Sequence, residues 1–353
     1  MSILEQMYTG SHEQLLICSE PSVGLKALIA VHDTTLGPAC GGCRIWPHKT
    51  EQDAISDVLR LSEAMTYKSA AADLSLGGGK ALIIADPRTD KSEGLMRALG
   101  VFIESLGGRY ITTEDVGCTP RDIEYVARET QYAVGLPTSM GGSGETSIMT
   151  GLGVYLGMKA CAKSKWGSDS LSGKRIALQG FGHVSERLAP HLIKEGAQLI
   201  VCDLYEDATE KAKDMGAQIV EAKDIYDVDC DIFAPNALGG VLNSTTIPRL
   251  KCDIIAGGAN NQLLTKDDAI TITKKNILYG PDYIINAGGI INASCEIGSA
   301  YSESRAKAKT ERIYETTLNV IEMAKRDDIT TAEAADRLAK NRIETAKALR
   351  RFR

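Results

Sequence analysis

Residues 174–185 read KRIALQGFGHVS, and this stretch decides the fold of the 353-residue chain. It begins as a short aliphatic run typical of a buried strand and passes directly into a turn with glycine at positions 180 and 182. An amphipathic run follows, so a strand, a glycine turn and a helix succeed one another. This order predicts the first unit of a doubly wound, parallel α/β sheet of the Rossmann type.

Alternating strands and helices extend in both directions from this stretch. Downstream, the spacing of aliphatic runs predicts strands of βαβ units at 199–203, 232–235, 253–256 and 277–279. Upstream, we expect strands at 15–18, 27–32, 81–85 and 110–113, and helices at 51–65, 93–106 and 147–163. Beyond residue 286 the pattern is helical.

The length of the chain predicts two α/β domains, each with its own core. The N-terminal domain is expected over residues 1–142, joined by a C-terminal helix over 326–353. The Rossmann-type domain is expected over 143–325.

Composition excludes several classes of protein. The chain has 40 Lys+Arg and 46 Asp+Glu, so it lacks the basic excess of a general nucleic-acid binder. It has no apolar run of about 20 residues, and its first 20 residues do not form a secretory signal. Nine scattered cysteines and five histidines form neither a disulfide framework nor a ligand set for a metal. We therefore expect a cytoplasmic protein with reduced cysteines, no dedicated metal site, and neither nucleic acid nor a membrane as partner.

The glycine turn has the chemistry of an anion site. Gly180 permits a tight turn, Gly182 lets the backbone approach a pyrophosphate, and the helix N-terminus offers unpaired N–H groups. Ser185 stands where such turns often carry a third glycine. We expect the whole segment to bind a dinucleotide cofactor: Gly180, Phe181, Gly182, His183, Val184 and Ser185.

Asp203 ends the next predicted strand, about 20 residues beyond the glycines, where an acid can accept hydrogen bonds from ribose hydroxyls. No arginine follows within residues 204–206, so a 2′-phosphate would meet negative charge. These features favour NAD over NADP. The alternative for two glycines alone is an ordinary tight turn.

A lysine follows three glycines in the first domain, at Lys80. The stretch 76–80 resembles a phosphate loop, but that motif needs glycine at Leu74 and a hydroxyl at Ala81, so we reject it. We expect Lys80 at a strand edge, held by three flexible residues, with Lys68 upstream at the end of a helix. Two ammonium groups in one pocket would lower each other's pKa, and such a lysine can act as a general base.

Asp115 lies just beyond a predicted strand end, where α/β folds place functional side chains. A carboxylate there can balance the lysines and exchange protons. The alternative is that both lysines are solvated and that Asp115 caps a helix beginning near Thr119. The spacing alone leaves both interpretations open.

Tyr155 and Lys159 have the Y-x-x-x-K spacing of short-chain dehydrogenases. In those enzymes the glycine turn comes first in the chain, whereas here the pair precedes Gly180. We therefore interpret the two residues as neighbours on one helix face.

Several motifs together closely resemble the Glu/Leu/Phe/Val dehydrogenase family, especially leucine dehydrogenase and its phenylalanine, valine and tryptophan relatives. They match in order over nearly the whole chain: HDTTLGP at 32–38, GG at 41–42, MTYK at 65–68, LGGGK at 76–80, EDVG at 114–117 and NAGG at 286–289. The resemblance implies a homo-oligomeric enzyme with its site in a cleft between the two domains. The first domain would bind substrate and form the subunit contacts, and the second would bind NAD. The implied reaction is the reversible oxidative deamination of an apolar L-amino acid to its 2-oxo acid and ammonia.

The resemblance also implies roles for individual residues. Lys68 would hold the substrate carboxylate, Lys80 would be the base that activates water, and Asp115 would exchange protons with the amino group. Asn261 would orient the substrate and Thr150 would meet the carboxamide of the cofactor. We expect further cofactor contacts from Asn236, Ala259 and Asn260.

The substrate pocket implied by the resemblance is lined by Cys40, Gly41, Met65, Thr113, Ile290 and Ala293. Glutamate-specific relatives carry a lysine where Cys40 stands, so this wall is neutral and an acidic substrate would be unpaired. Leucine-specific relatives carry Leu and Val where this chain has Cys40 and Ala293. The pocket is therefore expected to be roomier, which keeps an aromatic amino acid open as the alternative substrate. A non-catalytic, NAD-responsive binding protein is the alternative of a different class.

Overall fold

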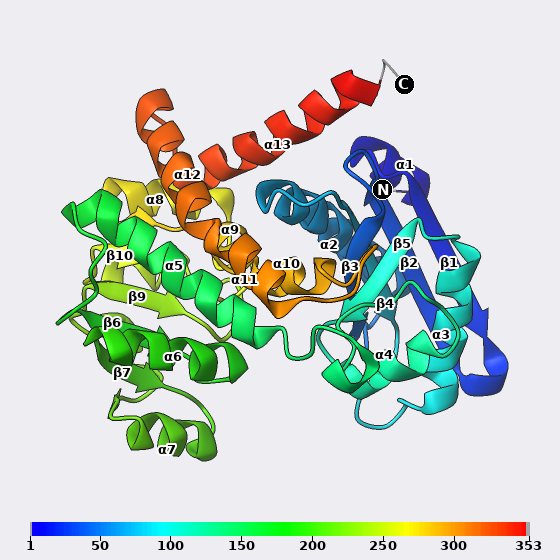
Figure 1. Cartoon of the computed structure of the whole chain (residues 1–353), viewed down its shortest axis with the longest axis horizontal. Helices are drawn as coiled ribbons and strands as arrows, with labels where there is room; N and C mark the ends of the chain where they lie inside the picture. The colour runs from blue at the N-terminus through cyan, green and yellow to red at the C-terminus, as the bar shows by residue number, and fades with distance from the viewer. Residues whose placement is uncertain (1, 351–353) are drawn as a thin grey trace. The chain divides into compact units, whose positions relative to one another are not determined.

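The computed structural model describes residues 2–350, which form two compact units (Figure 1). The first unit contains the residues up to Glu145, the segment Asn292–Glu303 and the chain from Ala339 onward. The second unit contains Thr146–Ile291 and Ser304–Leu338. The sequence predicted a single return to the first domain near residue 326, whereas the compact units have two, because a short segment after Ile291 also belongs to the first unit.

The first unit is built on a five-stranded sheet with the order β1-β2-β4-β3-β5. The strands are β1 (Gln14–Glu20), β2 (Leu25–Asp33), β3 (Ala39–Ile45), β4 (Gly77–Ile83) and β5 (Tyr110–Glu114). The last three of these run parallel to one another, β2 pairs antiparallel with β4, and β1 pairs antiparallel with β2.

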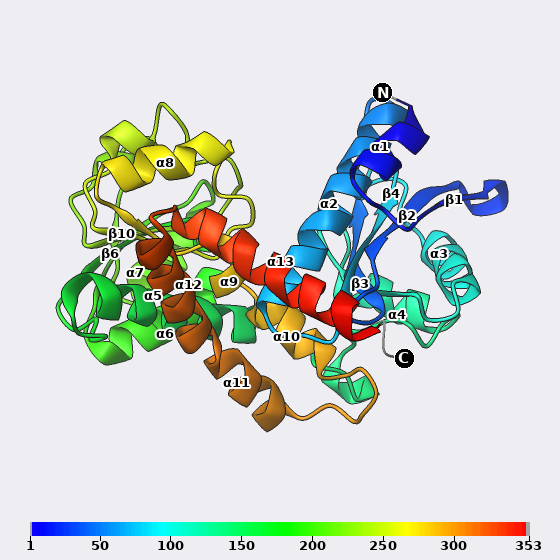
Figure 2. The same cartoon turned by 90° about the horizontal axis from the view of Figure 1, so that it is seen from above.

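Helices cover both faces of this sheet. On one face, α2 (Glu51–Ala71) packs Ala54 and Val58 against Leu28 and Leu82 of the strands. On the other face, the core is formed with α3 (Glu93–Ser105) and α4 (Pro120–Ala127). Figure 2 shows α2 on one side of the strands and α3 on the other, with α1 (Ile3–Thr9) beside α2.

The strand β3 was missed by the sequence analysis. It reads ACGGCRI, and two adjacent glycines give no strand signal. The glycines are required by close backbone contact, because a Cβ on Gly41 would lie 1.8 Å from the carbonyl oxygen of Gly79 in the neighbouring strand. Tertiary packing, and not a local sequence pattern, therefore explains why this segment forms a central strand.

The prediction that three flexible glycines hold Lys80 at a strand edge was wrong. Gly77, Gly78 and Gly79 are the first residues of β4, which pairs with β2 and β3 on its two sides. A Cβ on Gly78 would lie 2.1 Å from the backbone nitrogen of Thr66, so α2 packs directly on this strand. Lys80 is consequently fixed by a central strand and not by a loop.

The second unit contains a six-stranded sheet with the order β11-β10-β9-β6-β7-β8, in which every paired strand is parallel. Its strands are β6 (Arg175–Gln179), β7 (Gln198–Cys202), β8 (Gln218–Ile219), β9 (Ile232–Pro235), β10 (Ile254–Ile255) and β11 (Leu278–Tyr279). The accompanying helices are α5 (Ser147–Trp166), α6 (His183–Glu195), α7 (Glu206–Asp214) and α8 (Lys266–Lys274). This order confirms the predicted doubly wound fold.

The rest of the described chain is helical, as expected. It forms α9 (Asp282–Ile285), α10 (Gly288–Ser294), α11 (Glu303–Glu311), α12 (Ile313–Asp327) and α13 (Thr331–Arg350). In the first unit, Arg342 of α13 donates hydrogen bonds of 2.7 Å to the carbonyl oxygens of Ala70 and Ala71. Arg342 therefore adds side-chain donors to carbonyls at the end of α2, where Ala70 also accepts a hydrogen bond from the backbone nitrogen of Asp73.

All nine cysteines are free thiols. Within residues 2–350, no helix is both long and apolar enough to cross a membrane.

Candidate functional site

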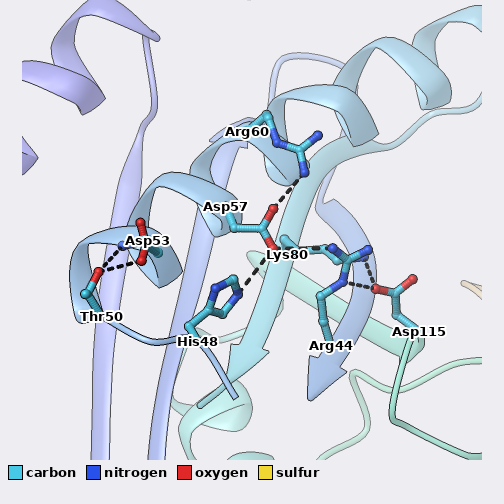
Figure 3. Close-up of polar contacts among 8 residues, drawn as sticks. All are labelled: Arg44, His48, Thr50, Asp53, Asp57, Arg60, Lys80 and Asp115. Atoms are coloured by element: carbon cyan, nitrogen blue, oxygen red, sulfur yellow. Dashed lines mark hydrogen bonds and ion pairs between the residues drawn. The ribbon is translucent and has the colours of Figure 1, made fainter. Parts of the chain in front are cut away.

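A buried ion pair joins two of the predicted site residues in the first unit (Figure 3). Lys80 lies on β4 and is only 4% exposed, and its Nζ lies 2.8 Å from Oδ2 of Asp115, just past the end of β5. Arg44 on β3 donates from Nε to the same oxygen at 2.9 Å. Three neighbouring strands thus bring one carboxylate and two cations together.

Two opposing effects act on the pKa of Asp115. Burial raises the pKa of this carboxyl. The charges and hydrogen bonds of Lys80 and Arg44 lower the pKa by more than burial raises it, so that the resulting value is about 2. Asp115 is therefore ionised at neutral pH and does not require an external counter-ion.

The structure contradicts two parts of the alternative that the sequence left open for these residues. Helix α4 is capped by Thr119, which forms a capping box with Asp122, so the prediction that Asp115 caps this helix was wrong. The prediction that Lys80 is solvated was also wrong, because its ammonium is enclosed between the strands and Asp115.

Other predicted residues lie on the strands and helix around this pair. Lys68 and Met65 lie within α2, which continues to Ala71, and Lys68 lies in its last turn, which agrees with the predicted place at the end of a helix. Met65 lies over Gly41, because a Cβ on that glycine would be 3.3 Å from its Cγ. On β5, the buried hydroxyl of Thr113 has no hydrogen-bond partner within residues 2–350.

Cys40 on β3 is fully buried, and burial raises the pKa of its thiol to about 12. The carboxylate of Glu296 raises this pKa further, while Lys80 opposes the shift. Glu296 is itself fixed, since its Oε1 accepts hydrogen bonds from the backbone nitrogens of Gly135 (2.8 Å) and Ser143 (2.7 Å). The wall formed by Cys40 is therefore small and uncharged, with a negative charge nearby.

Two further predicted pocket residues, Ile290 and Ala293, are buried on α10.

In the second unit, the glycine turn between β6 and α6 is held by its own side chains. Gly180 has a φ of 95°, in the left-handed region that favours glycine. Ser185 is buried and donates from Oγ to the carbonyl oxygen of Gly180 at 2.7 Å. Ser185 thus stabilises the turn in place of a third glycine. A Cβ on Gly182 would meet no atom within 4 Å, so space remains beside the helix N-terminus.

Asp203 follows β7 and connects it to this turn. Its Oδ2 accepts a hydrogen bond from the backbone nitrogen of Phe181 at 2.7 Å, and its Oδ1 accepts one from that of Tyr205 at 3.0 Å. A carboxylate offers about four acceptor positions. Asp203 therefore retains acceptor capacity for the hydroxyls of a ribose.

Two segments that follow β9 and β10 lie next to the glycine turn. Asn236 accepts a hydrogen bond at Oδ1 from the backbone nitrogen of Gly258 (2.6 Å), whereas its buried Nδ2 has no partner within residues 2–350. A Cβ on Gly258 would lie 2.9 Å from Val184 of α6. The side chain of Asn236 is thus bonded, through Oδ1, to the segment that packs on the first turn of α6.

Asn286 anchors the segment that contains Ala259 and Asn260. Its Nδ2 donates to Asn260 Oδ1 at 2.9 Å and to the carbonyl oxygen of Gly258 at 3.2 Å. Asn261, the next residue, has a left-handed φ of 52°. On α5, Thr150 donates from Oγ1 to the carbonyl oxygen of Thr146 at 3.0 Å.

Comparison with known proteins identifies the family. Residues 12–132 match the model of the Glu/Leu/Phe/Val dehydrogenase dimerisation domain, and residues 141–204 and 203–351 match that of Glutamate/Leucine/Phenylalanine/Valine dehydrogenase. Leucine dehydrogenase of Thermoactinomyces intermedius is 51% identical, over 99% of this chain and 96% of its own. The chain belongs to the Glu/Leu/Phe/Val dehydrogenase family. It is therefore an amino-acid dehydrogenase, an oxidoreductase that uses NAD(H), as the motif resemblance implied.

Two further relatives extend the comparison. Phenylalanine dehydrogenase of Bacillus thermotolerans is 48% identical, over 97% of this chain and 90% of its own. The crystal structure of L-tryptophan dehydrogenase from Nostoc punctiforme has a TM-score of 0.84 and 46% identity, covering 98% of this chain and 100% of that one.

The residues of the second unit of this dehydrogenase fit a dinucleotide. The open space at Gly182 and the N-terminus of α6 suit a pyrophosphate, and the spare acceptors of Asp203 suit ribose hydroxyls. The orphaned, buried Nδ2 of Asn236 is a donor that lacks an acceptor, which a bound cofactor can supply.

The Tyr155–Lys159 pair has a structural role in the dehydrogenase. Tyr155 donates from its hydroxyl to Glu195 Oε2 at 2.6 Å, and Lys159 donates to Glu195 Oε1 at 2.8 Å. Both residues thus fasten α5 to the end of α6, which agrees with the interpretation as neighbours on a helix face.

Sequence reasoning missed three polar residues next to the predicted ones: Arg44, Glu296 and Asn286. Arg44 directly follows the Gly41-Gly42-Cys43 run, and Asn286 opens the quoted NAGG motif, so both lie in stretches already singled out. No pattern in the sequence connects Glu296 with Cys40, because the two lie 256 positions apart. Only the folded first unit brings them together.

Proposed function

We propose that this dehydrogenase catalyses the NAD-dependent, reversible oxidative deamination of a branched-chain, leucine-like L-amino acid to its 2-oxo acid and ammonia. The observation that carries the proposal is the buried Lys80–Asp115 pair, 2.8 Å long, in a chain 51% identical to a leucine dehydrogenase over nearly its whole length. A lysine and a carboxylate in contact can exchange protons with the same substrate.

In the proposed reaction, Lys68 pairs with the substrate carboxylate and holds the amino acid in place. Bound NAD supplies the acceptor for the hydride that leaves Cα. Asp115 takes a proton from the substrate ammonium before the hydride leaves. Lys80, in its neutral form, removes a proton from the water that attacks the resulting iminium carbon. Asp115 returns its proton to the nitrogen of the carbinolamine, and as the C–N bond breaks the hydroxyl loses its proton to become the 2-oxo group and ammonia leaves. The opposite sequence of proton transfers serves reductive amination.

The proposed cofactor site uses the turn Gly180–Ser185 for the pyrophosphate and Asp203 for the adenosine ribose. Leu204 and Tyr205, which follow Asp203, are exposed and uncharged, and Glu206 is acidic, so these three positions supply no cation for a 2′-phosphate. This supports NAD over NADP. We further assign Thr150, Asn236, Ala259, Asn260 and Asn261 to the cofactor and its nicotinamide end.

The surroundings of Cys40 support an apolar substrate. An acidic side chain would meet a neutral thiol and the carboxylate of Glu296 instead of a cation. Burying an unpaired carboxylate costs on the order of several kcal/mol. We therefore assign the side-chain pocket to Cys40, Gly41, Met65, Thr113, Ile290 and Ala293, with a preference against glutamate.

An aromatic substrate is the second candidate. Cys40 and Ala293 are both smaller than the Leu and Val of leucine-specific family members, which leaves volume for a larger side chain. The 46% identity to a tryptophan dehydrogenase fits this alternative.

We propose a symmetric homo-oligomer in the cytoplasm, without nucleic-acid or membrane partners. The match of residues 12–132 to a domain described as a dimerisation domain supports the assembly.

The decisive experiment measures NADH formation at alkaline pH with NAD and each of the twenty L-amino acids separately. We expect turnover with Leu, Val or Ile; a preference for Phe, Tyr or Trp would establish the second candidate. Lys80→Ala should abolish turnover and leave NAD binding intact, whereas Lys211→Ala, at an exposed ion pair with Glu186, is the control. Unchanged turnover in Lys80→Ala, or no turnover with any amino acid, would contradict the proposal.

A further inference from the structure

A chain of ion pairs runs from Asp115 back to helix α2 (Figure 3). Arg44 on β3 donates from Nε to Asp115 Oδ2 at 2.9 Å and from Nη1 to Asp57 Oδ2 at 3.3 Å. All three side chains are largely buried, with exposed fractions of 22% for Arg44, 16% for Asp57 and 21% for Asp115. Ion pairs that are this sheltered hold a defined geometry better than exposed ones.

Arg44 and Lys80 contact the same oxygen of Asp115. Lys80 Nζ and Arg44 Nε both lie within 3 Å of Oδ2, and within residues 2–350 no contact of Oδ1 is found. Two donors converging on one oxygen fix the rotation of the carboxylate. Oδ1 is therefore the oxygen that remains available for proton exchange with a substrate.

Asp57 fixes Arg44 from the other side. Asp57 lies on α2, and Arg60 and His48 also approach its carboxylate, Arg60 at 2.7 Å from Oδ1 and His48 at 3.5 Å from Oδ2. The guanidinium is planar and presents its N–H groups in a rigid fork, so a contact at Nη1 determines the direction of Nε. A lysine in place of Arg44 would keep the charge but lose this fork.

We propose that Arg44 is a positioning residue for the deamination, which orients Asp115 and is itself aimed by Asp57. This inference rests on the proposed function, because it gives Asp115 the proton-exchange role. Arg44 acts on the reaction only through Asp115 and does not touch the substrate in this scheme.

The loss of Arg44 has a predictable electrostatic effect. Burial raises the pKa of Asp115, and the charged groups that oppose this effect are Lys80 from β4 and Arg44 from β3. The other polar groups of the network lie further away, because Asp57 contacts Arg44, and Arg60 and His48 contact Asp57. Without Arg44 only Lys80 remains in contact, so the pKa of Asp115 must rise.

The experiment compares Arg44→Gln, Arg44→Lys and Asp57→Asn with the unmodified enzyme, with Arg97→Gln as matched control. Arg97 lies on α3 of the same unit and pairs with Glu129 at 2.6 Å, but it is about half exposed and its ion-pair partners in the described chain, Glu93 and Glu129, lie outside the network. We measure kcat, KM for the amino acid, the pH profile of kcat/KM and NAD affinity.

We expect Arg44→Gln to lower kcat on the order of 100-fold with little change in KM, because a misplaced catalytic group impairs the chemical step. The acidic limb of its pH profile should move to higher pH. Arg44→Lys should return the limb toward its original position without restoring kcat. Asp57→Asn should lower kcat about tenfold, less than Arg44→Gln, because Arg44 keeps its direct contact with Asp115. Arg97→Gln should stay within about twofold of the unmodified enzyme.

A second readout needs no turnover and separates this inference from the proposed function. In protein labelled with ¹³C at the aspartate carboxyl carbon, the Asp115 signal, assigned by its loss in Asp115→Asn, should stay unchanged from pH 7 to pH 4. In Arg44→Gln the same signal should begin to titrate within this range. If Arg44→Gln lowers kcat and the melting temperature but leaves this titration and the pH profile unchanged, its role is merely structural and the inference is overturned. If no amino acid is turned over but the titration moves, the proposed function fails while the coupling of Arg44 to Asp115 stands.

Discussion

The low pKa of Asp115 predicts a specific dependence of stability on pH. The pKa is about 2 in the folded protein against an ordinary value of 3.8. Each unit of pKa difference corresponds to about 1.4 kcal/mol, so ionised Asp115 stabilises the fold by about 2.5 kcal/mol. Because the folded-state pKa is the lower one, this stabilisation is complete above pH 3.8 and disappears as the pH falls toward 2.

The perturbation that tests this is Asp115→Asn, since asparagine resembles the protonated carboxyl in size. The free energy of unfolding should be lower in the variant at pH 7. This deficit should shrink by about 2 kcal/mol as the pH is lowered toward 2, because the unmodified protein loses the same interaction there. Lys80, which is buried beside Asp115, loses its negatively charged partner both in the variant and in the unmodified protein at low pH.

Urea unfolding followed by tryptophan fluorescence can isolate the unit concerned. The chain has two tryptophans, Trp46 in the first unit and Trp166 in the second. A Trp166→Phe background therefore reports the first unit alone, at one fixed protein concentration. In an Arg44→Gln background the pH-dependent part of the deficit should be smaller, which serves as the internal control. A deficit that is the same at pH 7 and near pH 3 would refute the argument.

Three further predictions concern other parts of the molecule. Tyr155→Phe should leave kcat within about twofold in the amino-acid assay, because Tyr155 binds Glu195 and not the substrate; a large loss would revive the short-chain dehydrogenase pattern. Gly78→Ala should lower the free energy of unfolding by about 1–3 kcal/mol, measured by thermal melting, because its Cβ would lie 2.1 Å from Thr66 of α2; an unchanged melting temperature would show that α2 can move away. Asp203→Ala should reduce the preference for NAD over NADP in kcat/KM, and equal use of both cofactors by the unmodified protein would contradict the role given to Asp203.

The second unit could be predicted well because its signals are local. The strand β6, the turn at Gly180 and the start of α6 are consecutive in sequence, and Asp203 directly follows the next strand, β7. Short-range patterns such as these determine both the backbone conformation and the approximate place of the cofactor residues. The parallel order of the six strands then follows from the short connections and the fixed handedness of βαβ units.

The first unit was predicted less completely because its glycines are required by close contacts with residues that lie elsewhere in the chain. Gly41 and Gly78 weaken any local strand signal, yet they are required where β3 meets β4 and where α2 meets β4. A sequence pattern that indicates a flexible loop in isolation becomes a rigid central strand once close backbone packing is imposed.

The sequence by itself determined the α/β class, the Rossmann-type unit, the family and the candidate residues Lys80 and Asp115. Only the tertiary structure decided their geometry and the low pKa of Asp115. Arg44 lies 71 positions from Asp115 and 13 from Asp57, and the three meet because parallel pairing of β3 with β5 and packing of α2 on the sheet bring them together. Electrostatic interaction depends on distance through space and on burial, and neither can be read from separation along the chain.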